Sequence, residues 1–90
     1  MTTELAIEGY LVVEEATPAD ALGVKNALEA QIVTNQLGSV VGGGCEISSP
    51  KFDLQVNTDN PQQLEEFLRA LLKEKNFDED LQLTFTPRST

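Results

Sequence analysis

Residues 40–48, VVGGGCEIS, contain three consecutive glycines beside the only cysteine of the chain. In a phosphate-binding loop, such glycines lie between a strand and a helix and are followed by a lysine and a hydroxyl group. Here the next lysine is Lys51, and the segment leads into a second predicted strand. We therefore interpret Gly42, Gly43 and Gly44 as a bulge or twist in a strand. The alternative is that a ligand or partner lies against bare backbone there.

Cys45 is the only thiol of the chain, but its surroundings do not favour a thiolate. A catalytic cysteine needs a nearby base or a helix N-terminus, whereas the sequence contains no histidine and places Glu46 beside the thiol. Cys45 alternates in phase with Val41, Gly43 and Ile47, so we expect it in or near the core as a small apolar residue.

The missing residue types exclude whole classes of sites. Without histidine, and with one cysteine, the chain cannot form the usual zinc, copper or iron centres or a Ser-His-Asp or Cys-His catalytic group. The adjacent acids at 14–15, 65–66 and 78–80 lack the spacing of a calcium loop and are typical of solvated surface. We expect no catalytic residues, no metal and no cofactor.

The charge is strongly acidic, with a formal net value of −9. This field disfavours nucleic acid and anionic membranes and favours cationic partners. No apolar run is long enough to cross a membrane, and the N-terminus has no basic segment of the kind that starts a secretory signal. We expect a single domain over residues 1–90, a cytoplasmic location, and a frayed tail at 87–90.

Two periodicities predict the elements that position these residues. Alternating apolar residues predict strands at 5–15, in the glycine segment, at 52–58 and at 81–87. Helical spacing predicts one helix at 18–36 and another from Pro61 to about Lys75. Thr17 and Asn60 are the predicted N-caps, with Asp20 and Gln63 at the capping-box positions, and Gly38 is the predicted left-handed residue that ends the first helix.

The resulting order, β-α-β-β-α-β, is the split βαβ arrangement of ferredoxin-like α+β domains. It predicts a four-stranded antiparallel sheet with both helices on one face, strand order 4-1-3-2, and the glycine-rich strand at an edge. The predicted core is Leu5, Ile7, Leu11, Val13, Leu28, Ile32, Phe52, Leu54, Val56, Leu64, Phe67, Leu68, Leu71, Leu83 and Phe85.

The chain resembles this fold without matching a family motif within it. An RNA-binding sheet would show several aromatic residues and basic surroundings, and a metal chaperone would show paired cysteines. An acylphosphatase would carry an arginine in the first strand-to-helix loop, and an amino-acid-binding regulatory domain would carry a glycine there. The loop instead reads EEATPAD. Function therefore has to be argued from surfaces rather than from the fold.

The uncovered face of the sheet is the best candidate surface, because it combines acids, amides and threonines with one aromatic residue. We predict a small acidic protein-interaction module, which could be an inhibitor or immunity-type protein that binds a basic partner, or a weakly homodimerising adaptor. The alternative is a small-ligand sensor, and an enzyme is less well supported. The candidate interaction residues are Glu8, Tyr10, Val12, Gly42, Gly43, Gly44, Asp53, Gln55, Asn57 and Thr84, with Gln82 and Thr86 on the same face.

Overall fold

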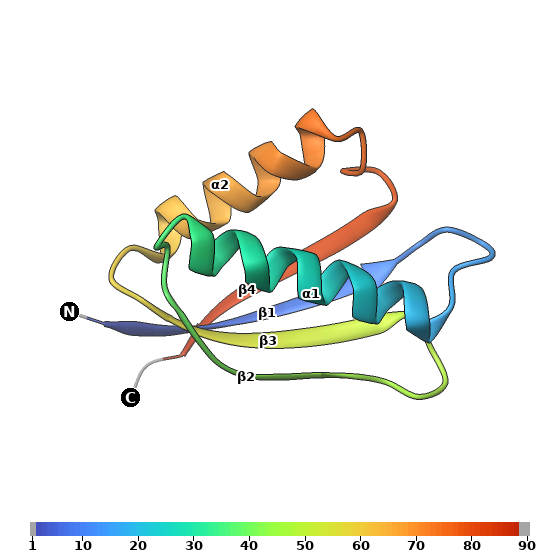
Figure 1. Ribbon diagram of the computed structural model, residues 1–90, viewed down its shortest axis with the longest axis horizontal. Helices are drawn as coiled ribbons and strands as arrows, with labels where there is room; N and C mark the ends of the chain where they lie inside the picture. Colours follow the sequence, from blue (N-terminus) through green and yellow to red (C-terminus); the bar gives the residue numbers. More distant parts are fainter. Residues whose placement is uncertain (1, 89–90) are drawn as a thin grey trace.

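The computed structural model describes residues 2–88 and contains six regular elements (Figure 1). The elements, in chain order, are β1 (Thr3–Leu11), α1 (Pro18–Thr34), β2 (Ser39–Cys45), β3 (Lys51–Thr58), α2 (Pro61–Glu74) and β4 (Leu81–Arg88). This β-α-β-β-α-β order with one antiparallel sheet confirms the predicted ferredoxin-like α+β fold.

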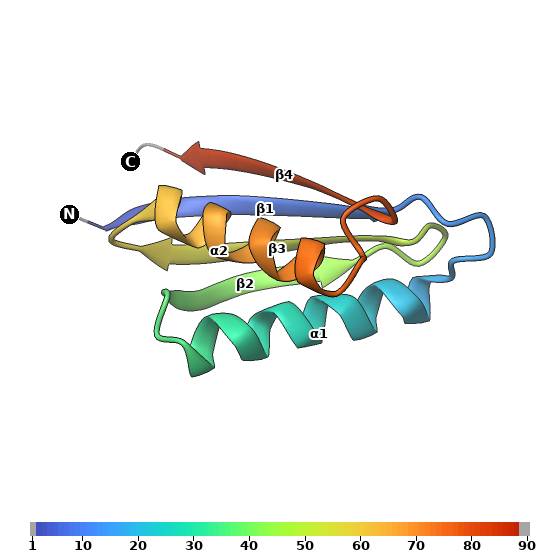
Figure 2. The ribbon, with the colours of Figure 1, turned by 90° about the horizontal axis from the view of Figure 1, so that it is seen from above.

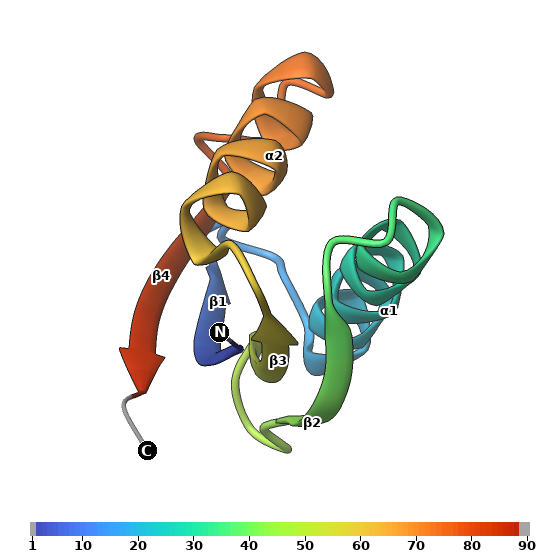
Figure 3. The same cartoon turned by 90° about the vertical axis from the view of Figure 1, so that its left-hand side faces the viewer.

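The sheet has the strand order β2-β3-β1-β4, and every neighbouring pair is antiparallel. Both helices cover the same face, with α1 over the β2–β3 side and α2 over the side of β1 and β4 (Figures 2 and 3). The glycine-rich β2 is an edge strand, as predicted. Among residues 2–88, no helix lies on the other face of the sheet (Figure 3), which we describe below as a candidate surface.

The helix starts agree with the predicted caps. Thr17 Oγ1 accepts a hydrogen bond from the Asp20 amide at 3.2 Å, and Asp20 Oδ2 accepts one from the Thr17 amide at 3.0 Å. This reciprocal pair is a capping box, and Pro18 occupies the first turn. In α2, Asn60 Oδ1 accepts from the Gln63 amide at 3.1 Å. Each cap satisfies backbone donors that the helix itself leaves unpaired.

The end of α1 differs from the prediction. Gln36, not Gly38, has the left-handed conformation, with φ of 54°. The Leu37 amide donates to the Ile32 carbonyl at 3.0 Å, and the Gln36 amide donates to the Val33 carbonyl at 3.2 Å. These two bonds form a Schellman motif two residues earlier than expected. Gly38 is required for a different reason, the close approach of β3. A Cβ on Gly38 would lie 2.6 Å from the Asn57 carbonyl oxygen.

The core lies between the helices and the sheet and contains most of the predicted residues. The prediction that Val13 lies in the core is wrong. β1 ends at Leu11 rather than at 15, so Val13 lies in the following loop and is 44% exposed. Along α2 the fully covered stripe is Leu64, Leu68 and Leu72, at i, i+4 and i+8. Three predicted core residues, Phe67, Leu71 and Phe85, are only partly buried, whereas the prediction omitted Ala21, Leu72 and Leu81.

The C-terminal strand is longer than expected. β4 continues through Arg88, which pairs with Glu4, and Pro87 pairs with Leu5 inside the strand. Proline is accepted there because β4 is an edge strand whose outer amides need no partner. Residues 87 and 88 of the predicted tail therefore belong to β4, and residues 89–90 lie outside the described part of the chain. Neither helix in residues 2–88 has the length and apolar character needed to cross a membrane.

Candidate functional site

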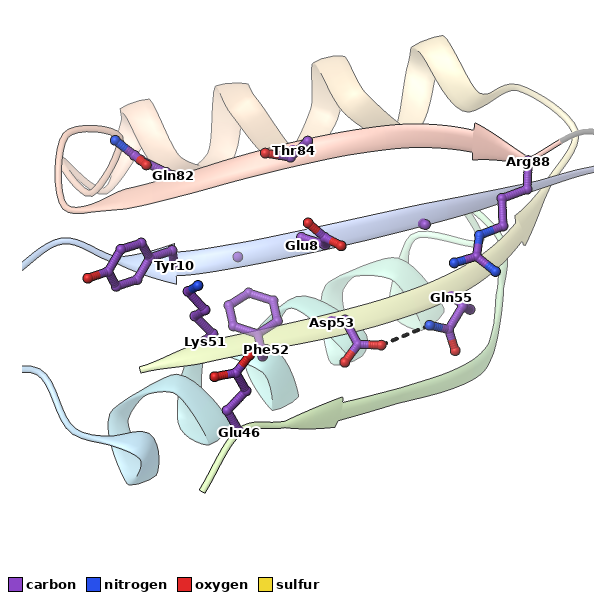
Figure 4. Close-up of a pocket in the computed structure, with 12 residues that line it drawn as sticks. Glu8, Tyr10, Glu46, Lys51, Phe52, Asp53, Gln55, Gln82, Thr84 and Arg88 are labelled. Atoms are coloured by element: carbon purple, nitrogen blue, oxygen red, sulfur yellow. Dashed lines mark hydrogen bonds between the residues drawn. The ribbon is translucent and has the colours of Figure 1, made fainter. Parts of the chain in front are cut away.

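The uncovered face of the sheet forms a shallow hollow of about 510 Å³ across three strands (Figure 4). Alternation along each strand turns every second side chain away from the helices and onto this face. We call this surface the open face. The side chains of β1, β3 and β4 that line the hollow are Ala6, Glu8, Tyr10, Lys51, Asp53, Gln55, Gln82, Thr84 and Arg88.

Two carboxylates lie at the centre of the open face. Glu8 in β1 is directly opposite Asp53 in β3, so their Cβ atoms are separated by about 4.5–5.5 Å, the usual cross-strand spacing. The Gln55 Nε2 group donates a hydrogen bond to Asp53 Oδ2 at 2.8 Å. Within residues 2–88, neither carboxylate forms an ion pair; the two ion pairs present there are Lys25–Glu29 and Arg69–Glu65. Like charges directly opposite in a sheet are destabilising, so this pair lowers the stability of the sheet.

The basic residues of the open face lie at its two ends. At one end, the Lys51 ammonium lies 5.3 Å from the centre of the Tyr10 ring, a cation–π contact between cross-strand partners. Arg88 lies at the other end (Figure 4), and it is paired in register with Glu4. The open face is therefore not uniformly acidic, because an acidic centre is flanked by two bases.

The three glycines of β2 have separate structural roles. Gly42 lies opposite Gln55, and a Cβ on Gly42 would overlap the Gln55 Oε1 atom, so this glycine leaves room for the amide that holds Asp53. Gly43 has φ of +157°, and a Cβ there would lie 2.6 Å from the Asp53 carbonyl oxygen and 3.1 Å from Lys25 Cε. Gly44 has no such restriction, since its nearest contact would be Asp53 Oδ1 at 3.7 Å. Close approach of neighbouring atoms is thus present at two of the three positions, whereas the irregularity in register falls between Val40 and Gly42.

A register shift between Val40 and Gly42 changes which residues of β2 face the core. Val40 pairs with Val56 and packs against the core, whereas Val41 is 53% exposed. Cys45 pairs with Phe52 and is half-buried against the same core, in the orientation that the sequence indicated. Ile47, expected in the same phase, lies beyond the strand and is 96% exposed.

The structure brings most of the predicted surface together. Glu8, Tyr10, Asp53, Gln55 and Thr84 line the hollow, with Gly42 and Gly44 beside them on β2. Three predicted members do not join it. Gly43 is paired with the buried Leu54 and lies near Lys25 of α1, on the helix side of the sheet. Val12 lies one residue beyond β1, where its amide donates to the Asp80 carbonyl at 2.9 Å. Asn57 lines a separate hollow near the α1–β2 connection.

Sequence reasoning missed Lys51 and Arg88. Each continues a recognised alternation, Lys51 two residues before Asp53 and Arg88 two residues after Thr86, but the predicted strands stopped short of both. Extending each predicted strand by one residue would have placed both bases on the open face. Between Thr2 and Arg88, no three histidine, cysteine, aspartate or glutamate side chains converge in a way that could hold a metal ion.

Comparisons of this chain with protein-family models, with curated proteins and with solved structures give no match.

Proposed function

We propose that this protein is a small interaction module whose open face binds a partner that presents a basic side chain, as an acidic inhibitor or immunity-type protein would. The observation that carries this proposal is the Glu8–Asp53 pair. Two carboxylates are held side by side at the centre of an uncovered sheet, and within the described chain no cation is paired with either. A guanidinium or ammonium group placed between them would replace their repulsion with charge-assisted hydrogen bonds.

The surroundings of the pair support an Arg-type ligand. Gln55 holds Asp53 in place, and Gly42 provides the space in which the Gln55 side chain lies. Tyr10, 41% exposed at the edge of the hollow, offers an aromatic surface of the kind that is enriched in protein interfaces. The net charge of −9 would also speed the approach of a basic partner.

The same charges favour a basic partner over a symmetric homodimer formed by stacking two open faces. A two-fold axis through the centre of this face would bring four carboxylates together, two from each copy. Such an arrangement costs several kcal/mol in like-charge contacts unless a cation intervenes. A different, basic surface meets the central acids without this cost.

The proposal can be tested with a defined probe, a capped hexa-arginine peptide, in an NMR titration of the labelled protein. We expect amide shifts concentrated at Glu8, Tyr10, Asp53, Gln55 and Thr84. The double variant Glu8→Gln/Asp53→Asn should weaken binding by about tenfold or more, because each charge-assisted hydrogen bond contributes roughly 1.5–3 kcal/mol.

The matched control is Glu14→Gln/Glu15→Gln, which removes the same net charge from the exposed β1–α1 loop. This control should retain binding within about twofold, since its effect is limited to the long-range field. Equal losses in the two double variants, or shifts spread over all acidic surfaces, would mean that the peptide responds to net charge alone and would refute the site.

A further inference from the structure

A further hollow lies on the helix side of the sheet, between the two helices. Viewed along the sheet, α1 and α2 diverge as they cover its two halves (Figure 3). Between them is a cleft of about 320 Å³ whose lining is mainly apolar, with Val24 and Ala27 from α1, Leu71 from α2, and Phe77 from the loop after α2. This cleft shares no residue with the hollow of the open face.

The cleft exists because each helix directs its best apolar stripe at the sheet rather than at the other helix. In α2 the stripe Leu64, Leu68 and Leu72 is buried against the sheet, with Leu72 also bordering the cleft, and Leu71 lies on the flank that faces α1. On the α1 side, the facing residue Ala27 is too small to fill the space. Val24, Leu71 and Phe77 are consequently only partly buried and retain apolar surface that a ligand could cover.

Two polar side chains, Gln31 from α1 and Lys75 from the end of α2, also line the cleft. Within residues 2–88, Lys75 makes no ion pair. The Lys75 ammonium is also not needed to cap α2, because backbone amides already pair with carbonyls at the end of this helix. The amides of Asn76 and Phe77 donate to the carbonyls of Lys73 and Leu72 at 3.1 and 2.8 Å. The positive charge beside the apolar lining is therefore free to meet a ligand.

We propose that this cleft binds a monocarboxylate with a single apolar chain or ring, whose carboxylate meets Lys75 while its apolar part lies among Val24, Leu71 and Phe77. An apolar lining with a few placed polar groups is the usual composition of a small-molecule site. The volume is at the small end of the ~300–1,000 Å³ range of such sites, which favours one chain or ring over a large cofactor. This site is independent of the proposed protein-binding face.

The probes for the test are decanoate and decanol, which share a chain and differ in charge, titrated separately into the labelled full chain and followed by NMR. We expect both to shift the amides of Ala27, Leu71 and Phe77, and decanoate to bind about two- to fivefold more tightly, the range expected for one solvent-exposed ion pair. Absence of shifts at about 5 mM decanoate, or shifts confined to other surfaces, would overturn the proposal.

Two pairs of variants locate the ligand. Ala27→Leu should fill the cleft and weaken both probes by about tenfold, whereas Ala70→Leu, the same change at an exposed α2 position outside the lining, should leave both unchanged. Lys75→Gln should abolish the preference for decanoate over decanol, and Lys73→Gln should retain it. If Ala27→Leu, shown to be folded by its melting curve, binds decanoate normally, the cleft is not the site. If wild-type protein binds the two probes equally, the carboxylate assignment is wrong.

Discussion

The absence of a side chain at Gly9 makes room for the ring of Phe52 in the sheet. It lies in β1 directly opposite Phe52 of β3, and the buried Phe52 ring covers it so closely that an added Cβ would overlap the ring, with Cε2 only 2.9 Å away. Phe52 is 3% exposed and belongs to the packed core, so an added Cβ would force its ring to shift among tightly packed neighbours. Gly9→Ala should therefore lower the free energy of unfolding by about 1–3 kcal/mol, the usual cost of overpacking, measured by urea denaturation.

Gly23→Ala is the matched control, because a Cβ at Gly23 in α1 would meet no atom within 4 Å. The same substitution should there raise the free energy of unfolding by about 0.5–1 kcal/mol, since alanine is the better helix former. Adding Phe52→Leu to Gly9→Ala should cost less than the sum of the two single changes. A Gly9→Ala variant as stable as the parent would show that the ring does not lie over this position.

At the scale of the element, both helices end in a Schellman motif whose left-handed residue is not glycine. Gln36 after α1 and Asn76 after α2 have φ of 54° and 57°. The left-handed conformation costs a side-chain-bearing residue roughly 1–2 kcal/mol, and less for asparagine. Gln36→Gly should therefore raise the free energy of unfolding by about 1 kcal/mol, and Asn76→Gly by less.

Thr34→Gly serves as the control for this prediction. Thr34 is the last residue of α1, where glycine relieves no strain and is a poorer helix former. Denaturation curves should show this variant to be unchanged or less stable. If Gln36→Gly also fails to stabilise the protein, the assigned end of α1 is incorrect.

The edge strand β2 provides a second comparison at this scale. Gly43→Val should be destabilising although valine is the better strand former, because φ of +157° and the Asp53 carbonyl 2.6 Å from the new Cβ both oppose a side chain. Gly44→Val should be close to neutral, since its nearest contact is at an ordinary 3.7 Å. The difference in melting temperature between the two variants measures the effect, and equal values would mean that Gly43 is ordinary strand.

For the whole molecule, the net charge of −9 predicts opposite responses to salt for two kinds of association. Raising the salt from about 20 to about 500 mM shortens the Debye length from roughly 20 to 4 Å, so both the repulsion between copies and the attraction to a basic partner are screened. Self-association, measured by light scattering, should stay weak and increase with salt. Binding of hexa-arginine should decrease. If self-association and hexa-arginine binding changed in the same direction as the salt was raised, an electrostatic origin for either would be contradicted.

The sequence alone determined the features that depend on neighbouring residues. Alternation located the strands, and Thr17 with Asp20 located the start of α1. The helical spacing of apolar residues located α2, at Leu64, Phe67, Leu68, Leu71 and Leu72. Each signal is a pattern of backbone hydrogen bonding or side-chain direction within a few residues. Element order then sufficed for the ferredoxin-like topology and for the edge position of β2.

Only the tertiary structure decided the features that depend on register and on the separation of elements. It placed Glu8 opposite Asp53, shifted the register at Val41, and extended the strands far enough to bring Lys51 and Arg88 onto the open face. It also left a cleft between α1 and α2. These features arise from packing between residues far apart in the chain, where a shift of one residue moves a side chain to the other face and no local pattern records the choice.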